Sequence, residues 1–240
     1  MKPDRHSPER PRQRRAERSE QIRSALIEAA ADVVGEVGYA DASIARITAR
    51  AGVAQGTFYN HFESRQQLFD DLLPQIGQRM IAFVVARVDP ALRGADRDVA
   101  RLRAYFAFLE ENPEFYRILY EAETLAPVAH ARHMQRILAG YVRALQRSLE
   151  AGELHPDIGA RDLEPIAMML LSARGYLSMH YGAGRETGGK VPDWVIDSYA
   201  RLVSNGLFRS TDAASAPGAS NGPPPPSAPE TDAPEPPDAR

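Results

Sequence analysis

The 240-residue chain contains no cysteine and a single tryptophan. Without cysteine, the chain has no disulfide, no cysteine-ligated zinc and no thiol nucleophile. No apolar run approaches the roughly 18 residues that a membrane-spanning helix needs. The charged N-terminal stretch also lacks the apolar segment of a signal peptide. We therefore expect a cytoplasmic protein that does not bind membranes.

A surplus of positive charge is also missing, because the formal net charge is -3. The charges are nevertheless separated along the chain. Residues 1–23 hold eight Lys or Arg against four Asp or Glu, whereas residues 211–240 hold one Arg against five acids. A phosphate backbone responds to the local field rather than to the net charge. The N-terminal end therefore remains suited to a polyanionic partner.

Helical periodicity dominates the sequence, and we find no strand pattern and no internal repeat, which indicates an all-α fold. We expect helices over 19–37, 64–88, 98–110, 113–123, from Pro127 to just before Gly152, and over 162–181 and 192–208. The expected organisation is a disordered basic arm (1–15), a three-helix DNA-binding domain (16–70), a larger helical domain (71–209) and a disordered acidic tail (210–240). Nine of the nineteen prolines lie in that tail, which therefore cannot build a packed core.

In and just after the expected arm lies a cluster of arginines, namely Arg10, Arg12, Arg14, Arg15 and Arg18. Two interpretations fit the cluster equally well. It is a solvated tail, or it is an arm that reaches phosphates or the minor groove of a duplex.

Residues 43–69 carry the pattern of two short helices joined by a tight turn. Ile44 and Ile47 are three apart and share one helical face. Ser43 is suited to cap the first helix, because its hydroxyl can accept a free backbone N–H. Ala51-Gly52-Val53 supplies the turn, since glycine adopts positive φ at little cost.

The segment from Gln55 to His61 follows as a compact helix, and Ser64 with Gln67 forms a capping box that opens the next helix. This order resembles the DNA-binding domain of the TetR (tetracycline repressor) family. The residues that carry the resemblance are Ile47, Ala51-Gly52-Val53, Gly56-Thr57-Phe58-Tyr59, His61-Phe62, Ser64-Arg65 and Leu68. An ordinary helical hairpin is the alternative, but it does not require so many positions to agree at once.

The resemblance implies that a recognition helix over about Ala54–Asn60 enters the major groove of DNA. The residues implied to contact DNA are Ser43, Arg46, Gln55, Gly56, Thr57, Tyr59, Asn60, His61 and Arg65. The Gln55 amide can bond adenine, the Thr57 methyl can meet a thymine methyl, and the Tyr59 hydroxyl can bond a phosphate. Ala54 and Gln55 replace the family's usual Ser-Lys, which removes one positive charge.

The resemblance further implies a homodimer through the helices 162–181 and 192–208. The helix over 162–181 is apolar nearly all round and too apolar to face water. Pro74 lies inside the expected helix 64–88, which joins the two domains. A hinge at Pro74 and a merely structural bend are both consistent with that position.

A ligand pocket is implied among the helices between residues 98 and 181. Its candidate residues are polar side chains in apolar helices, namely Tyr116, Tyr120, His133, Arg174 and His180. A buried Arg174 needs an anionic partner, which is Glu121, another internal acid or the ligand itself, with an internal pair favoured. His130 and His133 lack a third ligand at suitable spacing, so we expect no metal site and no cofactor.

The sequence thus predicts a ligand-responsive DNA-binding regulator. The expected activity is repression at a palindromic operator, relieved by a small, mainly apolar molecule. One alternative is an all-α enzyme, although we find no nucleophile–base motif, phosphate loop or metal set. The other is a protein that bridges DNA without sequence preference.

Overall fold

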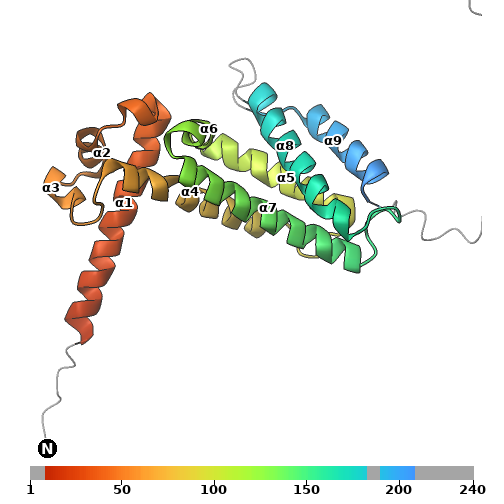
Figure 1. Ribbon diagram of the computed structural model, residues 1–240, viewed down its shortest axis with the longest axis horizontal. Helices are drawn as coiled ribbons and strands as arrows, with labels where there is room; N and C mark the ends of the chain where they lie inside the picture. Colours follow the sequence, from red (N-terminus) through yellow and green to blue (C-terminus); the bar gives the residue numbers. More distant parts are fainter. Residues whose placement is uncertain (1–8, 183–189, 209–240) are drawn as a thin grey trace, which may run out of the picture. The chain divides into compact units, whose positions relative to one another are not determined.

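The computed structural model describes residues 9–182 and 190–208, and within these ranges the chain is all-helical, as predicted (Figure 1). The helices are α1 (Glu9–Asp41), α2 (Ile44–Ala51), α3 (Gln55–Phe58), α4 (Arg65–Arg87), α5 (Gly94–Glu111), α6 (Glu114–Leu125), α7 (Pro127–Glu150), α8 (Leu163–Leu177) and α9 (Asp193–Gly206). A 3-10 turn (Ala160–Asp162) precedes α8, and a π-helical turn (Ser178–Gly182) follows it. Of these helices, none is long and apolar enough to span a bilayer.

The first helix starts earlier than the sequence pattern indicated. We expected it at Ser19 after a disordered arm, but α1 begins at Glu9, so the prediction of disorder is wrong for residues 9–15. The reason is local, because Arg, Gln, Glu and Ala all have high helix propensity. Pro11 lies in the first turn, where its missing N–H has no intrahelical partner to lose. The remainder of the expected arm (1–8), residues 183–189 and the expected acidic tail (210–240) lie outside the described ranges.

The break that we predicted after Val37 is present at Gly38. Its backbone has φ 81° and ψ 168°, a conformation that side-chain-bearing residues rarely adopt. Tyr39 follows with its ring buried edge-on against Phe69, at 4.7 Å between ring centroids. The C-terminal end of α1 is thereby anchored on α4.

Two clusters of buried side chains form the core of the described helices. The first joins α1 to α4 with α6, and its fully buried members include Leu26, Ile47, Phe58, Phe62, Leu72 and Ile118. The core below α2 and α3 therefore continues into α6, which packs along α1. The two expected domains share this hydrophobic cluster.

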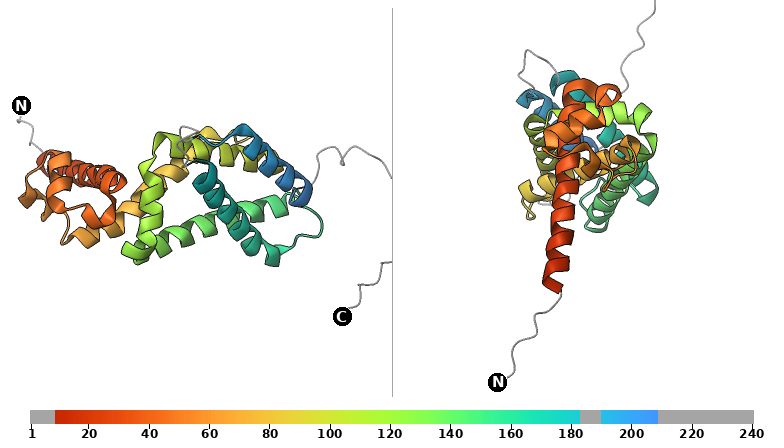
Figure 2. Two further views of the ribbon diagram at one scale, coloured as in Figure 1. Left: turned by 90° about the horizontal axis from the view of Figure 1, so that it is seen from above. Right: turned by 90° about the vertical axis from the view of Figure 1, so that its left-hand side faces the viewer.

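The second cluster joins α5, α7, α8 and α9 through side chains such as Leu102, Leu145, Leu163, Val195 and Val203. In it α8 packs against α7, while α9 packs against α5 (Figure 2). Two helices held by different neighbours leave space between them, and a groove lies there, as described below.

Proline and glycine mark the helix ends of this part of the chain, as predicted. Pro127 is the first residue of α7, and Pro113 and Pro192 stand at the N-caps of α6 and α9. Gly152 follows α7 with φ 67°. Pro74 lies within α4, as expected.

Candidate nucleic-acid interface and regulatory helices

Both ends of α2 are capped as the sequence predicted. The hydroxyl of Ser43 accepts the backbone N–H of Arg46 at 3.3 Å. Gly52 ends the helix in the left-handed region, with φ 68° and ψ 28°, and its N–H donates to the Ala49 carbonyl at 3.2 Å. These caps fix the angle at which the chain turns from α2 towards α3.

The recognition helix is shorter than predicted. We expected it to extend to Asn60, but α3 ends at Phe58. The chain continues in hydrogen-bonded turns, because the N–H groups of Asn60 and His61 donate to the carbonyls of Thr57 and Phe58 at 3.2 and 2.9 Å. A four-residue helix has few internal hydrogen bonds, so its position depends on the packing behind it.

That packing is aromatic and rigid. Phe58 and Phe62 are buried, with ring centroids 5.5 Å apart, and fill the core as predicted. The guanidinium of Arg23 lies 5.0 Å from the Phe62 ring and pairs with Asp71 on α4 at 2.6 Å. Together these contacts join α1, α3 and α4, so the outward face of α3 is held in one orientation.

The outward face carries the residues that the sequence singled out. Gln55, Gly56, Tyr59 and Asn60 are exposed, and Thr57 is half-buried. Tyr59 leaves 57% of its surface in solvent, although its ring meets that of Phe58 edge-on at 5.4 Å between centroids. A Cβ added at Gly56 would meet no atom within 4 Å, so this side of α3 is open to an incoming surface. Such a rigid helix with an open polar face can enter a DNA groove.

The cations near α3 differ in how far they are free to bind phosphates. Arg46 is exposed, and no carboxylate of the described residues pairs with it. Arg50 is held by Glu36 at 2.6 Å and Asp32 at 3.3 Å. Arg65, which we expected to take a phosphate, donates to the Ala40 carbonyl at 3.1 Å and also stacks on a ring. The free positive charge beside α3 is therefore small.

Of the five candidate ligand residues, Tyr120 lies near Arg174, because its hydroxyl is 3.8 Å from the Cβ position of Gly175. Tyr116 and Tyr120 lie together on α6, with ring centroids 4.4 Å apart. His133 is buried between α4 and α7, its ring 6.2 Å from that of Phe115. His180 is exposed on the π-helical turn that follows α8, where its ring lies 4.6 Å from that of Tyr181, and its role in ligand binding stays a prediction.

Burial shifts the ionisation of two of these residues. Desolvation, with smaller contributions from His130 and Arg136, lowers the pKa of His133 to about 4. Its Nε2 has no hydrogen-bond partner among the described residues. Burial also raises the pKa of Tyr116, and the neighbouring Tyr120 adds to this effect. Both groups therefore stay neutral near pH 7.

Arg174 forms an internal pair, as favoured from the sequence, but its partner is not Glu121. Its Nη2 lies 2.8 Å from Oδ1 of Asp98 on α5, and the Tyr199 hydroxyl donates to Oδ2 of Asp98 at 2.6 Å. Tyr141 contacts both charged groups. Burial alone would raise the pKa of Asp98, but Arg174 and the two hydroxyls outweigh it and keep that pKa below its usual range. This polar cluster, which the sequence pattern did not reveal, links α5, α7, α8 and α9.

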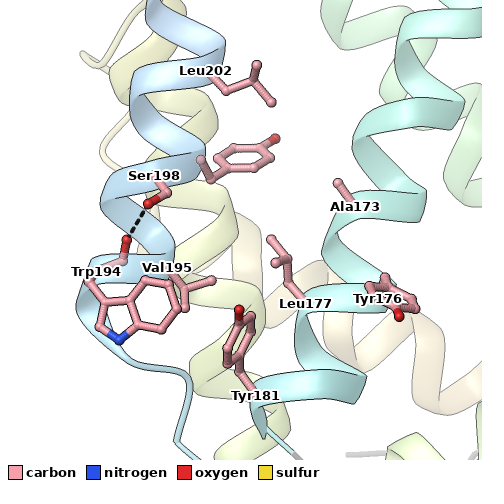
Figure 3. A pocket seen from close by; sticks show the side chains of 9 residues that line it. Ala173, Tyr176, Leu177, Tyr181, Trp194, Val195, Ser198 and Leu202 are labelled. Carbon is pink, nitrogen blue, oxygen red and sulfur yellow. Dashed lines mark hydrogen bonds between the residues drawn. The ribbon is translucent and has the colours of Figure 1, made fainter. Parts of the chain in front are cut away.

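Helices α8 and α9 present an apolar face to solvent. Between 53% and 67% of the surface is exposed at each of Met168, Met169, Tyr176, Trp194 and Leu202. A groove of about 410 Å³ opens on this face between the two helices, and its wall includes Leu177, Tyr181 and Val195 (Figure 3). The helix that the sequence indicated to be too apolar to face water is thus left partly uncovered by the described part of the chain. The sequence pattern did not single out Trp194. A single tryptophan two residues after the proline that opens a helix could have indicated this exposed position.

The rigid core, the capped α2 and the exposed face of α3 define a helix-turn-helix DNA-binding protein. The profile of bacterial regulatory proteins of the tetR family matches residues 26–72. The HTH-type transcriptional repressor DhaR from Mycobacterium sp. (strain GP1) is 30% identical over 210 residues, which cover 80% of this chain and 94% of DhaR. The chain belongs to the TetR family of DNA-binding transcriptional regulators, and it is not an enzyme.

Two further comparisons agree with this assignment. The HTH-type transcriptional activator FasR from Mycolicibacterium smegmatis is 35% identical over 103 residues, 41% of this chain and 45% of the length of FasR. The crystal structure of TylP, a TetR regulator from Streptomyces fradiae, has the same fold. It superposes with a TM-score of 0.66 at 22% identity, covering 82% of this chain and 91% of TylP.

Proposed function

We propose that this chain is a homodimeric repressor that holds a palindromic operator through α3 and releases it when a small, mainly apolar molecule binds. The supporting observation is the exposed face of α3, with Gln55, Gly56 and Tyr59, set on the buried aromatic pair of Phe58 and Phe62. Two such faces, spaced by one helical turn of DNA, fit successive major grooves. Repression is proposed because DhaR, which matches along most of the chain, is a repressor.

The apolar face of α8 and α9 supports the dimer. Contiguous exposed side chains of this size are rare on a monomer and are typical of an interface. A second copy would bury Met168, Met169, Trp194 and Leu202 against the same residues of its partner. The buried Asp98–Arg174 cluster joins α8 to α9 through the Tyr199 hydroxyl, which supports a defined arrangement of the two helices.

The effector is proposed to act through α6, which bears Tyr116 and Tyr120 and also packs along α1. Because Asp98 already neutralises Arg174, an effector needs no anionic end at that position. A molecule that binds better when α6 is displaced would shift the population of dimers. The displaced form separates the two α3 helices by a distance that no longer matches the grooves.

The assignment of α3 is tested by operator affinity. A duplex selected from random sequence by the protein would be titrated with wild-type chain, Tyr59→Ala and Tyr59→Phe, following fluorescence anisotropy. We expect Tyr59→Ala to weaken binding at least about tenfold, and Tyr59→Phe to lose the part due to the hydroxyl. Unchanged affinity in Tyr59→Ala, with an unchanged thermal unfolding midpoint, contradicts the role of α3. A footprint spread over unrelated sequence would favour a non-specific bridging protein instead.

The dimer is tested by charge on its apolar face. Met169→Glu and Leu202→Glu should each yield monomers in sedimentation and lose operator binding. Val128→Glu is the matched control, because Val128 is 61% exposed but lies on α7. If both interface variants sediment as dimers, the pairing through α8 and α9 is wrong.

A further inference from the structure

The first turns of α1 extend beyond the hydrophobic core. From Gln13 to Gln21 every side chain is exposed, and Ile22 is the first to pack against the core. A helix without tertiary contacts is only marginally stable in water. Among the described residues, no side chain packs on this segment. Its exposed charged side chains are therefore the groups available to bind a partner.

Those charges are arranged on the helix. At about 100° per residue, Arg14 and Arg18 are four apart and Arg15 and Arg18 are three apart, so the three share one side. Glu20 falls on the opposite side, and Glu17 at the edge. No carboxylate of the described residues forms an ion pair with these three arginines. The segment thus presents three free guanidinium groups in one direction.

The neighbouring helix-turn-helix has fewer free guanidinium groups. Arg50 is bound by Glu36, and Arg65 is bound to the end of α1, which leaves Arg46 as the free arginine of α2. The N-terminal turns of α1 extend from the end of the molecule that carries α2 and α3, and they point away from these two short helices (Figure 1). Residues 13–21 are about 13 Å long, close to the rise of four nucleotides along one DNA strand.

We propose that residues 13–21 of α1 form a second DNA-binding element, in which Arg14, Arg15 and Arg18 bind backbone phosphates flanking the groove that α3 enters. The partner is the phosphate backbone, so the element adds affinity and no sequence preference. Guanidinium groups suit this task, since they form paired hydrogen bonds with phosphate oxygens. This inference rests on the proposed function, because it requires that α3 is placed on DNA.

The test compares two triple variants of the full chain. One replaces Arg14, Arg15 and Arg18 by Gln, which keeps helix propensity and removes the charge. The matched control replaces Arg132, Arg136 and Arg143 by Gln, three exposed arginines of α7, and so has the same net charge. Dissociation constants for the operator and for a scrambled duplex would be measured from 50 to 300 mM salt.

We expect the α1 variant to bind both duplexes more weakly by a similar factor, at least about tenfold at low salt. The ratio of the two dissociation constants should stay unchanged. The slope of log K against log salt should fall by up to about 0.9 for each lost phosphate contact, while the control stays near wild type. Equal slopes in the α1 variant and the control overturn the proposal. A loss confined to the operator also overturns it, because that result indicates base reading.

The two proposals fail separately. If Tyr59→Ala leaves operator binding intact, the placement of α3 is wrong and this inference falls with it. If Tyr59→Ala abolishes specific binding while the α1 variant behaves like the control, α3 is confirmed and the α1 element alone is rejected. An acidic protein as the true partner of residues 13–21 would give that second result.

Discussion

The backbone N–H of Tyr39, the first residue after the break in α1, donates a hydrogen bond of 2.8 Å to Oε2 of Glu121 on α6. Arg117, one turn earlier on α6, donates to the carbonyls of Gly35 and Glu36 at 2.9 Å each. The two side chains thus bind the α1 backbone on both sides of Gly38. A Cβ at Gly38 would lie 2.8 Å from the same Glu121 carboxylate. Through these contacts α6 binds the C-terminal part of α1, the helix that packs against α2 and α4.

Removing the Glu121 carboxylate should destabilise the junction between α1 and α6. Tyr39 is buried, so Glu121→Ala leaves its N–H without an acceptor, at a cost of about 1–3 kcal/mol in unfolding free energy. Urea unfolding at fixed protein concentration measures the loss. Glu123→Ala is the control, because Glu123 is exposed on the same helix. Equal midpoints for the two variants would show that the contact is not stabilising.

The packing of α4 on α7 depends on a glycine. A Cβ built at Gly77 would lie 2.2 Å from Cε1 of His133, closer than real atoms approach. We therefore expect Gly77→Ala to destabilise the fold by about 1–3 kcal/mol, although alanine is the better helix former. The double variant Gly77→Ala with His133→Ala should lose less unfolding free energy than the two single variants lose in sum. Strict additivity would refute the contact.

His133 should make stability depend on acid. Its pKa is about 4 in the folded chain and 6.5 when unfolded, so the folded state favours the neutral ring. The contribution is complete above pH 6.5 and declines as the pH falls towards 4. When the pH falls from 7.5 to 5, the His133 contribution should lower the unfolding free energy by on the order of 2 kcal/mol.

Denaturant unfolding of His133→Leu at the two pH values isolates that contribution. The variant should lose less stability between pH 7.5 and pH 5 than the wild type, by about the amount above. A matched His155→Gln variant, altered at a more exposed histidine, should keep the wild-type dependence. If His133→Leu shows the full wild-type decline, carboxylates rather than His133 cause the acid sensitivity.

The buried pair of Asp98 and Arg174 should behave as a unit. Asp98→Asn leaves the guanidinium charge unpaired in the core, for which we expect a loss of about 3–5 kcal/mol. Arg174→Gln added to Asp98→Asn removes that charge and should recover part of the loss. The coupling energy from this double-mutant cycle is the measured quantity. A coupling near zero would show that the pair does not stabilise the fold.

Local chemistry made the DNA-binding end predictable from sequence. Ser43, Gly52 and Ser64 cap their helices through contacts within a few residues, so spacing alone identified them. Proline and charge favour disorder before Ser19, but α1 starts at Glu9, because Pro11 lies in the first turn, which tolerates proline.

Partners far apart in sequence could not be predicted in the same way. Asp98 lies 76 positions before Arg174, and which acid meets Arg174 depends on how α5 and α8 cross. Glu121, the partner suggested from sequence, is instead 82 positions from Tyr39, which it binds. Each of these outcomes is set by tertiary packing rather than by periodicity.

The exposed apolar face of α8 and α9 has a consequence for how the regulator responds to its own abundance. If two chains must associate through this face before DNA is bound, operator occupancy at low expression follows the square of the chain concentration. Halving the cellular amount would then empty roughly three-quarters of the occupied operators in that range. Dilution at cell division would act on transcription more steeply than a monomer allows, without any effector.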